Sequence, residues 1–171
     1  IHAVSWPAKL LDVAIPDSDV DGDLALVDLA LVDSSFTGSR AVWEGGRLRE
    51  LVATIAEPAA VGLSSIAARL APTSRRDPGA VHVTFGDGGR QHRVPIAPGL
   101  YSDVSVTGCR RLDEGDELRL EGPGVLSFDG ERDMVLNAGQ HAHVRVSATG
   151  PHIIDIAAAM AATAQPIDNH G

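Results

Sequence analysis

The sequence has little of several features that mark particular classes of protein. Its one cysteine, Cys109, cannot form an internal disulfide, which is compatible with a reducing compartment. No apolar run reaches the roughly 18 residues that a membrane-spanning helix needs, and no signal-peptide pattern stands at the start of the sequence. We therefore expect a soluble, cytoplasmic protein that does not act on membranes.

Positive charge and aromatic side chains are also scarce. Lys9 is the sole lysine, and the formal net charge is −9, which disfavours the phosphate backbone of a nucleic acid as a partner. Aromatic residues make up 4% of the chain, so a core must be filled by valine, leucine, isoleucine and alanine. With 171 residues, the chain is long enough for a single domain with a true core, over residues 1–171.

Short apolar segments separated by turn residues at roughly ten-residue spacing are the most frequent feature of the chain, and they are typical of a sandwich or barrel. We expect a mainly β fold, an antiparallel β-sandwich of roughly ten strands with one short helix in the middle of the chain and a C-terminal helix. The predicted elements include a strand over residues 24–32 that is buried on both faces, and a hairpin that turns at residues 86–89. They also include a serine-capped helix over residues 62–70 and an Ala-rich helix over 153–162 that packs against the body.

The strongest local signal lies between residues 125 and 147. Asp129-Gly130 separates two apolar arms and predicts a tight hairpin turn, because such a turn favours residues with positive φ. The next residue is Glu131, so two carboxylates, Asp129 and Glu131, stand at the hairpin tip. Asp-Gly is also what a purely structural turn prefers, and in that case Glu131 is simply solvated.

Two further sequence patterns could each indicate a metal site. Residues 17–28 resemble a calcium loop, with Asp17, Asp19, Asp21 and Gly22 in place but Asp28 where the template has glutamate; a solvated acidic turn is the alternative. His141 and His143 share one face of a strand and could bind zinc if Asp133 reached them, although strands carry such pairs without a metal.

Two segments could hold an anion. Small hydroxyl residues and a glycine precede Arg40, and backbone N–H groups with one guanidinium can cradle an anion. Gly62 and Ser64 stand at the start of the predicted helix, where phosphate can bind. An ordinary polar turn and an ordinary helix cap are the alternatives.

Four segments together resemble the C-terminal half of ATP-NAD kinase-like proteins of the acetoin-catabolism (AcoX-type) branch. The resemblance covers about residues 23–163 and is carried by DLALVDLALVDSSFTGSRAVW, EPAAVGLSSIAARL, GVLSFDGERDMVL and VRVSATGPHIIDIAAAMA. The wider superfamily includes NAD kinases, diacylglycerol kinases and sphingosine-type lipid kinases. Its members join an N-terminal α/β nucleotide-binding domain to a C-terminal β-sandwich, and this chain has no counterpart of the first part.

The resemblance implies a substrate-side domain of an ATP-dependent kinase that phosphorylates a hydroxyl acceptor, NAD or a similar molecule. Glu131 would be the base or hydroxyl-orienting group and Asp129 a metal ligand or its supporting partner. Gly130, Arg40, Gly62 and Ser64 would contact substrate.

The resemblance also implies that ATP and Mg²⁺ belong to the full-length protein, and that the isolated chain is inactive without its N-terminal partner domain. We also expect a homo-oligomer. The alternative is a non-catalytic binding or oligomerisation module that assembles through an exposed sheet edge.

Overall fold

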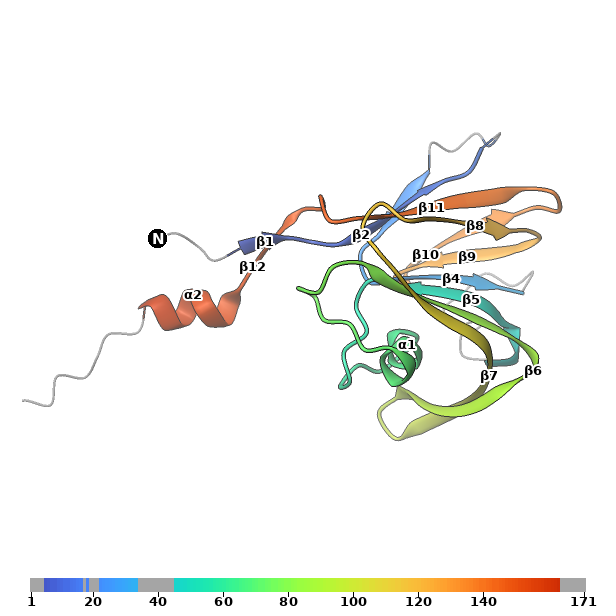
Figure 1. The fold of residues 1–171 in the computed structure, drawn as a ribbon, viewed down its shortest axis with the longest axis horizontal. Coiled ribbons are helices and arrows are strands. Elements are labelled where there is room, and N and C mark those ends of the chain that lie inside the picture. Colours follow the sequence, from blue (N-terminus) through green and yellow to red (C-terminus); the bar gives the residue numbers. More distant parts are fainter. Residues whose placement is uncertain (1–4, 17, 19–21, 34–44, 164–171) are drawn as a thin grey trace, which may run out of the picture.

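The computed structural model describes residues 5–16, 18, 22–33 and 45–163, and it shows a mainly β protein (Figure 1). Among these residues all strand pairs are antiparallel, and they form one six-stranded, one four-stranded and one two-stranded sheet, with two short α-helices. The expected fold class is therefore confirmed. No helix among the described residues has the length and apolar character needed to cross a membrane.

The larger layer of the sandwich is the six-stranded sheet. In spatial order its strands are β10 (Arg132–Leu136), β9 (Gly124–Phe128), β4 (Asp28–Val32), β5 (Leu48–Ala53), β6 (Ala80–Ala97) and β7 (Leu100–Leu112). A single 3-10 turn, Gly45–Arg47, leads into β5.

The second layer is the four-stranded sheet, which lies over part of the first (Figure 1). Its strands are, in spatial order, β3 (Asp23–Ala25), β2 (Leu10–Ala14), β11 (His141–Ser147) and β8 (Glu117–Glu121). On β2 and β11 buried apolar residues alternate with exposed ones, because only one face of this sheet meets the core.

Apolar side chains fill the space between the two layers. Phe128 is the largest fully buried side chain there, and it packs among leucines and valines of both sheets, including Leu11, Leu29, Leu126 and Val144. Aliphatic residues thus supply almost the whole core, as the low aromatic content requires.

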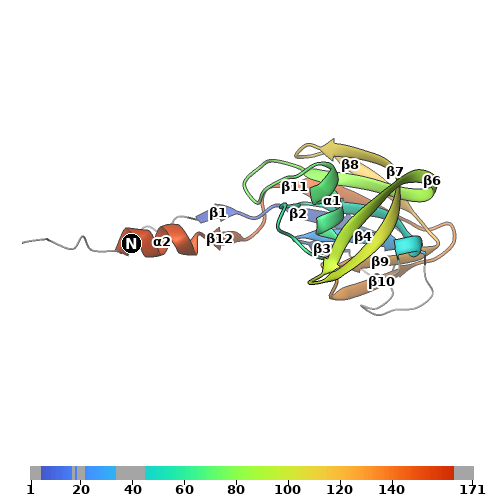
Figure 2. The ribbon, with the colours of Figure 1, turned by 90° about the horizontal axis from the view of Figure 1, so that it is seen from below.

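The six-stranded sheet is buried on its other face as well. There α1 (Ser64–Leu70) and the curled outer parts of β6 and β7 enclose a second core (Figures 1 and 2). Every residue of β4 is therefore buried: Leu29 and Leu31 belong to the first core, and Ala30 and Val32 to the second. This confirms a strand with two buried faces, but only over residues 28–32.

The prediction of one strand over residues 24–32 was wrong in one respect. The chain forms β3 in the four-stranded sheet, bends at Leu26 and Val27, and continues as β4 in the six-stranded sheet. The apolar run therefore crosses from one layer to the other, and Asp28 stands where it enters the second.

The predicted turn at residues 86–89 was also wrong. Phe85 and Arg90 both pair with Val106, so the four residues between them bulge out of one continuous strand, and β6 turns into β7 at residues 98–99. Glycine is required in the bulge, because a Cβ on Gly89 would stand 2.6 Å from the Val106 backbone.

The mid-chain helix is confirmed, but its serine cap is not. No side chain caps the N-terminus of α1. The Ser65 hydroxyl lies instead 2.6 Å from the carbonyl oxygen of Gly62 and 2.8 Å from that of Pro95, which ties the helix to β6.

The C-terminal helix forms, but it does not pack against the body as expected. β1 (Ser5–Pro7) and β12 (His152–Ile154) pair as a two-stranded ribbon, and α2 (Ile156–Thr163) continues from it, away from the sandwich (Figures 1 and 2). Ile156 and Met160 are 74% and 67% exposed. The helix is apolar all round, as the sequence indicates, yet large apolar side chains on it are exposed.

Candidate functional site

The candidate site is the turn between β9 and β10. Phe128 pairs with Arg132, so Asp129, Gly130 and Glu131 form a three-residue connection. Asp129 has φ 54° and Gly130 φ 69°, the left-handed conformation that Asp and Gly tolerate best. The hairpin that Asp-Gly predicts is confirmed.

The Asp129 carboxylate bonds to the backbone where the chain crosses between the sheets. Its Oδ1 accepts hydrogen bonds from the N–H groups of Leu26, Val27 and Asp28 at 3.0, 2.7 and 3.2 Å. The Asp129 N–H in turn donates to the Asp28 carbonyl oxygen at 2.9 Å. We call this set of bonds the crossover clamp; it fixes the hairpin tip against the bend between β3 and β4.

Asp28 lies directly beside the clamp and is buried. Loss of water around its carboxyl group, and secondarily the negative charge of Asp129, raise the pKa of Asp28 to about 6. Near neutral pH this group is therefore much closer to protonation than an exposed aspartate.

Arg132 closes the other side of the tip. Its guanidinium pairs with the Asp23 carboxylate, donates to the Leu24 carbonyl oxygen at 2.7 Å, and lies 3.8 Å from Oδ2 of Asp129. These bonds join β10 to β3, so both ends of the bend are tied to the same hairpin.

Glu131 differs from these residues. Its backbone N–H donates to the Phe128 carbonyl oxygen at 2.9 Å, but its side chain is exposed and forms no hydrogen bond or ion pair with any described residue. It lines none of three cavities, of about 380, 410 and 210 Å³, that described residues enclose. A rigid turn thus presents a carboxylate with no internal partner.

Comparison with known proteins identifies the family. The model of the acetoin catabolism protein X C-terminal domain matches residues 9–149. The chain belongs to this family. The acetoin catabolism protein X of Cupriavidus necator is 35% identical over 158 residues, which are 89% of this chain and 44% of that protein. The chain therefore spans less than half the length of the relative, and the resemblance inferred from the four segments is confirmed.

Arg40, Gly62 and Ser64 are the other predicted contact residues of this AcoX-family domain. Arg40 lies outside the described residues. Ser64 is buried in the second core region, and Gly62, with φ 87°, precedes the helix. No bond between described residues links either of them to Asp129, Gly130 or Glu131, so their roles stay predictions.

The two metal-binding alternatives gain no support from the part of the chain that the structure describes. His141 and His143 do share one face, with their Nε2 atoms 3.1 Å apart, but no group of three or more His, Cys, Asp or Glu side chains there could hold a metal ion. Asp17, Asp19 and Asp21 of the calcium-like loop lie outside the described residues, and Asp28 is buried beside the clamp.

Sequence reasoning missed Thr54 as part of the site. Its buried hydroxyl lies 2.6 Å from the Leu26 carbonyl oxygen, and its N–H donates to the Val27 carbonyl oxygen at 2.9 Å. A lone threonine at the end of a strand gives no signal of this kind. Asp28 was the sequence signal that could have indicated the site, because it is a carboxylate within an otherwise apolar run.

Replacing Asp129 tests the clamp. Asp129→Ala leaves up to three amides without their acceptor and puts alanine at positive φ, so we expect a loss of about 3 kcal/mol of folding free energy. Asp129→Asn, which keeps one acceptor oxygen and tolerates the left-handed backbone, should lose less. Urea unfolding followed by circular dichroism measures both. Glu131→Gln is the control and should leave stability unchanged; equal stability of Asp129→Ala would contradict the clamp.

Asp28→Asn tests the buried carboxyl. Because the folded-state pKa lies above the unfolded value, the stabilising contribution of Asp28 is complete below about pH 4 and is lost as the pH rises through about 6. At pH 7 the variant should therefore be more stable than the parent by about 1–3 kcal/mol, and near pH 4 the difference should vanish. Thermal unfolding at both pH values measures this. The exposed Asp133→Asn should show no such dependence, and a gain for Asp28→Asn that is equal at both pH values would refute the prediction.

Proposed function

We propose that this chain is the substrate-side C-terminal domain of an ATP-dependent, NAD-kinase-like phosphotransferase acting on a hydroxyl acceptor such as NAD. The proposal rests on a difference between the two carboxylates of the hairpin tip. Asp129 is committed to the crossover clamp, whereas Glu131, two residues on, is exposed and unpaired among the described residues. A carboxylate held in this way is available to a substrate or to a second domain.

The chemistry suits such a group. Phosphoryl transfer depends mainly on positioning and on charge stabilisation, and one carboxylate commonly orients the acceptor hydroxyl. In this proposal Glu131 accepts the hydrogen bond of that hydroxyl, and Gly130 lets substrate approach the backbone because it has no side chain. Asp129 acts as a positioning residue, since its oxygens already bind Leu26, Val27 and Asp28.

ATP and Mg²⁺ belong to the whole protein in this proposal. Mg²⁺ would neutralise the phosphate charge during transfer. The described residues hold no group of three carboxylate or imidazole ligands for Mg²⁺, so this part of the protein is poorly suited to bind the ion. The isolated chain is therefore expected to show no turnover, with Arg40, Gly62 and Ser64 contributing only acceptor contacts.

In this proposal the partner of the chain is the part of the full-length protein that lies outside the match to the relative. More than half of the Cupriavidus necator protein lies outside the match, and the ribbon and α2 offer exposed apolar side chains, Ile154, Ile156 and Met160. In the proposal these residues lie against the nucleotide-binding part.

Turnover by the full-length protein tests the role of Glu131. With ATP, Mg²⁺ and NAD, we expect Glu131→Gln to lower kcat by about 100-fold or more while the folded state is retained, because the amide is a poor base. Glu114→Gln, which alters another exposed glutamate at a tight turn, should leave kcat unchanged. Unaltered turnover of folded Glu131→Gln would remove this residue from the mechanism.

A non-catalytic oligomerisation module is the second candidate, and the exposed apolar helix favours it. If α2 pairs with a second copy, light scattering should give a dimer mass independent of nucleotide, and Ile156→Glu should return the monomer mass. Val61→Glu is the matched control, because Val61 is also exposed, at 51%, but lies near α1. A monomer at all concentrations would exclude this candidate.

A further inference from the structure

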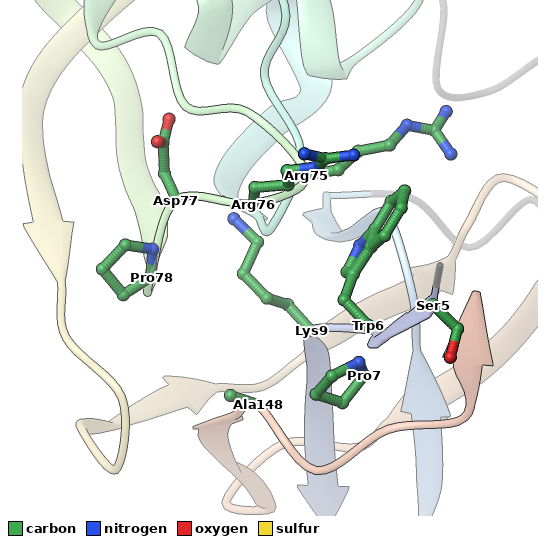
Figure 3. A pocket seen from close by; sticks show the side chains of 9 residues that line it. All are labelled: Ser5, Trp6, Pro7, Lys9, Arg75, Arg76, Asp77, Pro78 and Ala148. Atoms are coloured by element: carbon green, nitrogen blue, oxygen red, sulfur yellow. The ribbon is translucent and has the colours of Figure 1, made fainter. Parts of the chain in front are cut away.

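A separate cavity lies where the ribbon joins the sandwich. It has a volume of about 380 Å³ and is bounded by two stretches of chain and one alanine (Figure 3). Its lining residues are Ser5, Trp6, Pro7, Lys9, Arg75, Arg76, Asp77, Pro78 and Ala148. The volume is within the range of small-molecule sites, and none of these residues belongs to the hairpin tip.

Lys9, the sole lysine of the chain, is buried in this lining, with 6% of its surface exposed. Its Nζ donates to the Ser74 carbonyl oxygen at 2.9 Å. Its other two ammonium hydrogens have no protein acceptor among the described residues. Burial lowers the pKa of Lys9 to about 8, against the opposing charge of Asp77, while Arg111 lowers it further. A buried ammonium with unused hydrogens is costly unless an acceptor binds it.

Two arginines add positive charge to the same wall. The Arg76 guanidinium lies 4.5 Å from the centroid of the Trp6 ring and pairs with Asp155. Among the described residues, Arg75 forms an ion pair with the exposed Glu57, at 3.7 Å. The one acidic residue of the lining, Asp77, is occupied by its own loop, because its carboxylate accepts the Ser74 N–H at 2.7 Å.

Trp6 contributes a further unused donor. Its indole N–H is buried without a hydrogen-bond partner in the described structure. In Figure 3 the indole nitrogen is on the edge of the ring that faces Lys9. A buried donor left unpaired costs roughly 1–3 kcal/mol, so such groups normally have a partner.

Lys9 and Trp6 thus bring unused donors to the cavity, and most of its remaining surface is apolar. We propose that the cavity binds a small organic oxyanion, whose phosphate or carboxylate group lies between Lys9 and Arg75 and whose apolar part lies against Trp6, Pro7 and Pro78. Both oxyanions offer only acceptors, which matches the donors present. The inference does not depend on the proposed phosphotransfer.

The indole N–H resonance of Trp6 in a ¹H–¹⁵N spectrum tests this proposal. The chain has two tryptophans, and Trp43→Phe removes the second indole signal, so that the remaining one belongs to Trp6. We expect phenyl phosphate or benzoate to shift this resonance saturably at millimolar concentration, and sodium chloride at equal ionic strength to leave it in place. Stronger binding of phenyl phosphate identifies a phosphate ligand, and stronger binding of benzoate a carboxylate. Inorganic phosphate alone should bind more weakly than phenyl phosphate, because it lacks the apolar part.

Variants of residues that line the cavity test whether the ligand binds there. Lys9→Met keeps the apolar stem and should weaken binding by about tenfold or more, since it removes a charge-assisted hydrogen bond. If that variant does not fold, Arg75→Met serves instead, because Arg75 is exposed and weakly paired. Arg119→Met, on β8, is the control and should bind as the parent does. A shift that never saturates, or unchanged affinity in folded Lys9→Met or Arg75→Met, overturns the proposal.

Discussion

The Asp129 carboxylate is the contact on which the arrangement of the two sheets depends. The chain has to leave the four-stranded sheet after β3 and enter the six-stranded sheet at β4, and at that bend the amides of Leu26, Val27 and Asp28 cannot bond to a neighbouring strand. One carboxylate from the β9–β10 turn accepts all three, and Thr54 binds the carbonyl groups on the other side. Backbone groups that are shielded from water must be paired; these bonds pair the partly buried groups of the bend and join three distant parts of the sequence.

The clamp also explains the two neighbouring acidic residues. Asp129 is bound by backbone amides, whereas burial, and secondarily the charge of Asp129, raise the pKa of Asp28 beside it. Glu131 is on the far side of the same turn, where no described group competes for it. Three carboxylates in one small region therefore have three different environments, and only that of Glu131 leaves its oxygens available.

The parts of the fold that follow local rules could be predicted from the sequence. The Asp129-Gly130 hairpin forms because the conformational preference of the two residues decides it, and β4 is buried on both faces as the apolar residues after Asp28 indicate. The prediction of a turn at Gly86–Gly89 was wrong because local preference does not decide the structure there. Glycines suit a bulge as well as a turn, and the choice between them depends on how far β7 extends beside β6, which is a long-range contact.

Long-range contacts also limit what the sequence can predict about the sites. The position of Glu131 at the hairpin tip follows from the local sequence, while its role stays a prediction; Thr54 and the cavity around Lys9 gave no local signal. Lys9 bonds to Ser74 across 65 positions of the sequence, which is a long-range contact. Nothing in either segment indicates the meeting. The projecting α2 was mistaken for a packed helix because an apolar surface predicts burial without saying which surface covers it.

The location of the cavity gives the ribbon a physical role. At the base of the ribbon the Ala8 N–H donates to the Pro151 carbonyl oxygen, and the Ala8 carbonyl oxygen accepts from the Gly150 N–H. Arg76, from the loop before β6, pairs with Asp155, which follows β12. Trp6 and Arg76, which line the cavity, belong to the two sides of that junction. A ligand held there would contact both sides at once, so its binding energy would favour the position of the ribbon in which the cavity is intact. By thermodynamic linkage, a partner that holds α2 in that position would raise the affinity of the cavity for its ligand by the same factor.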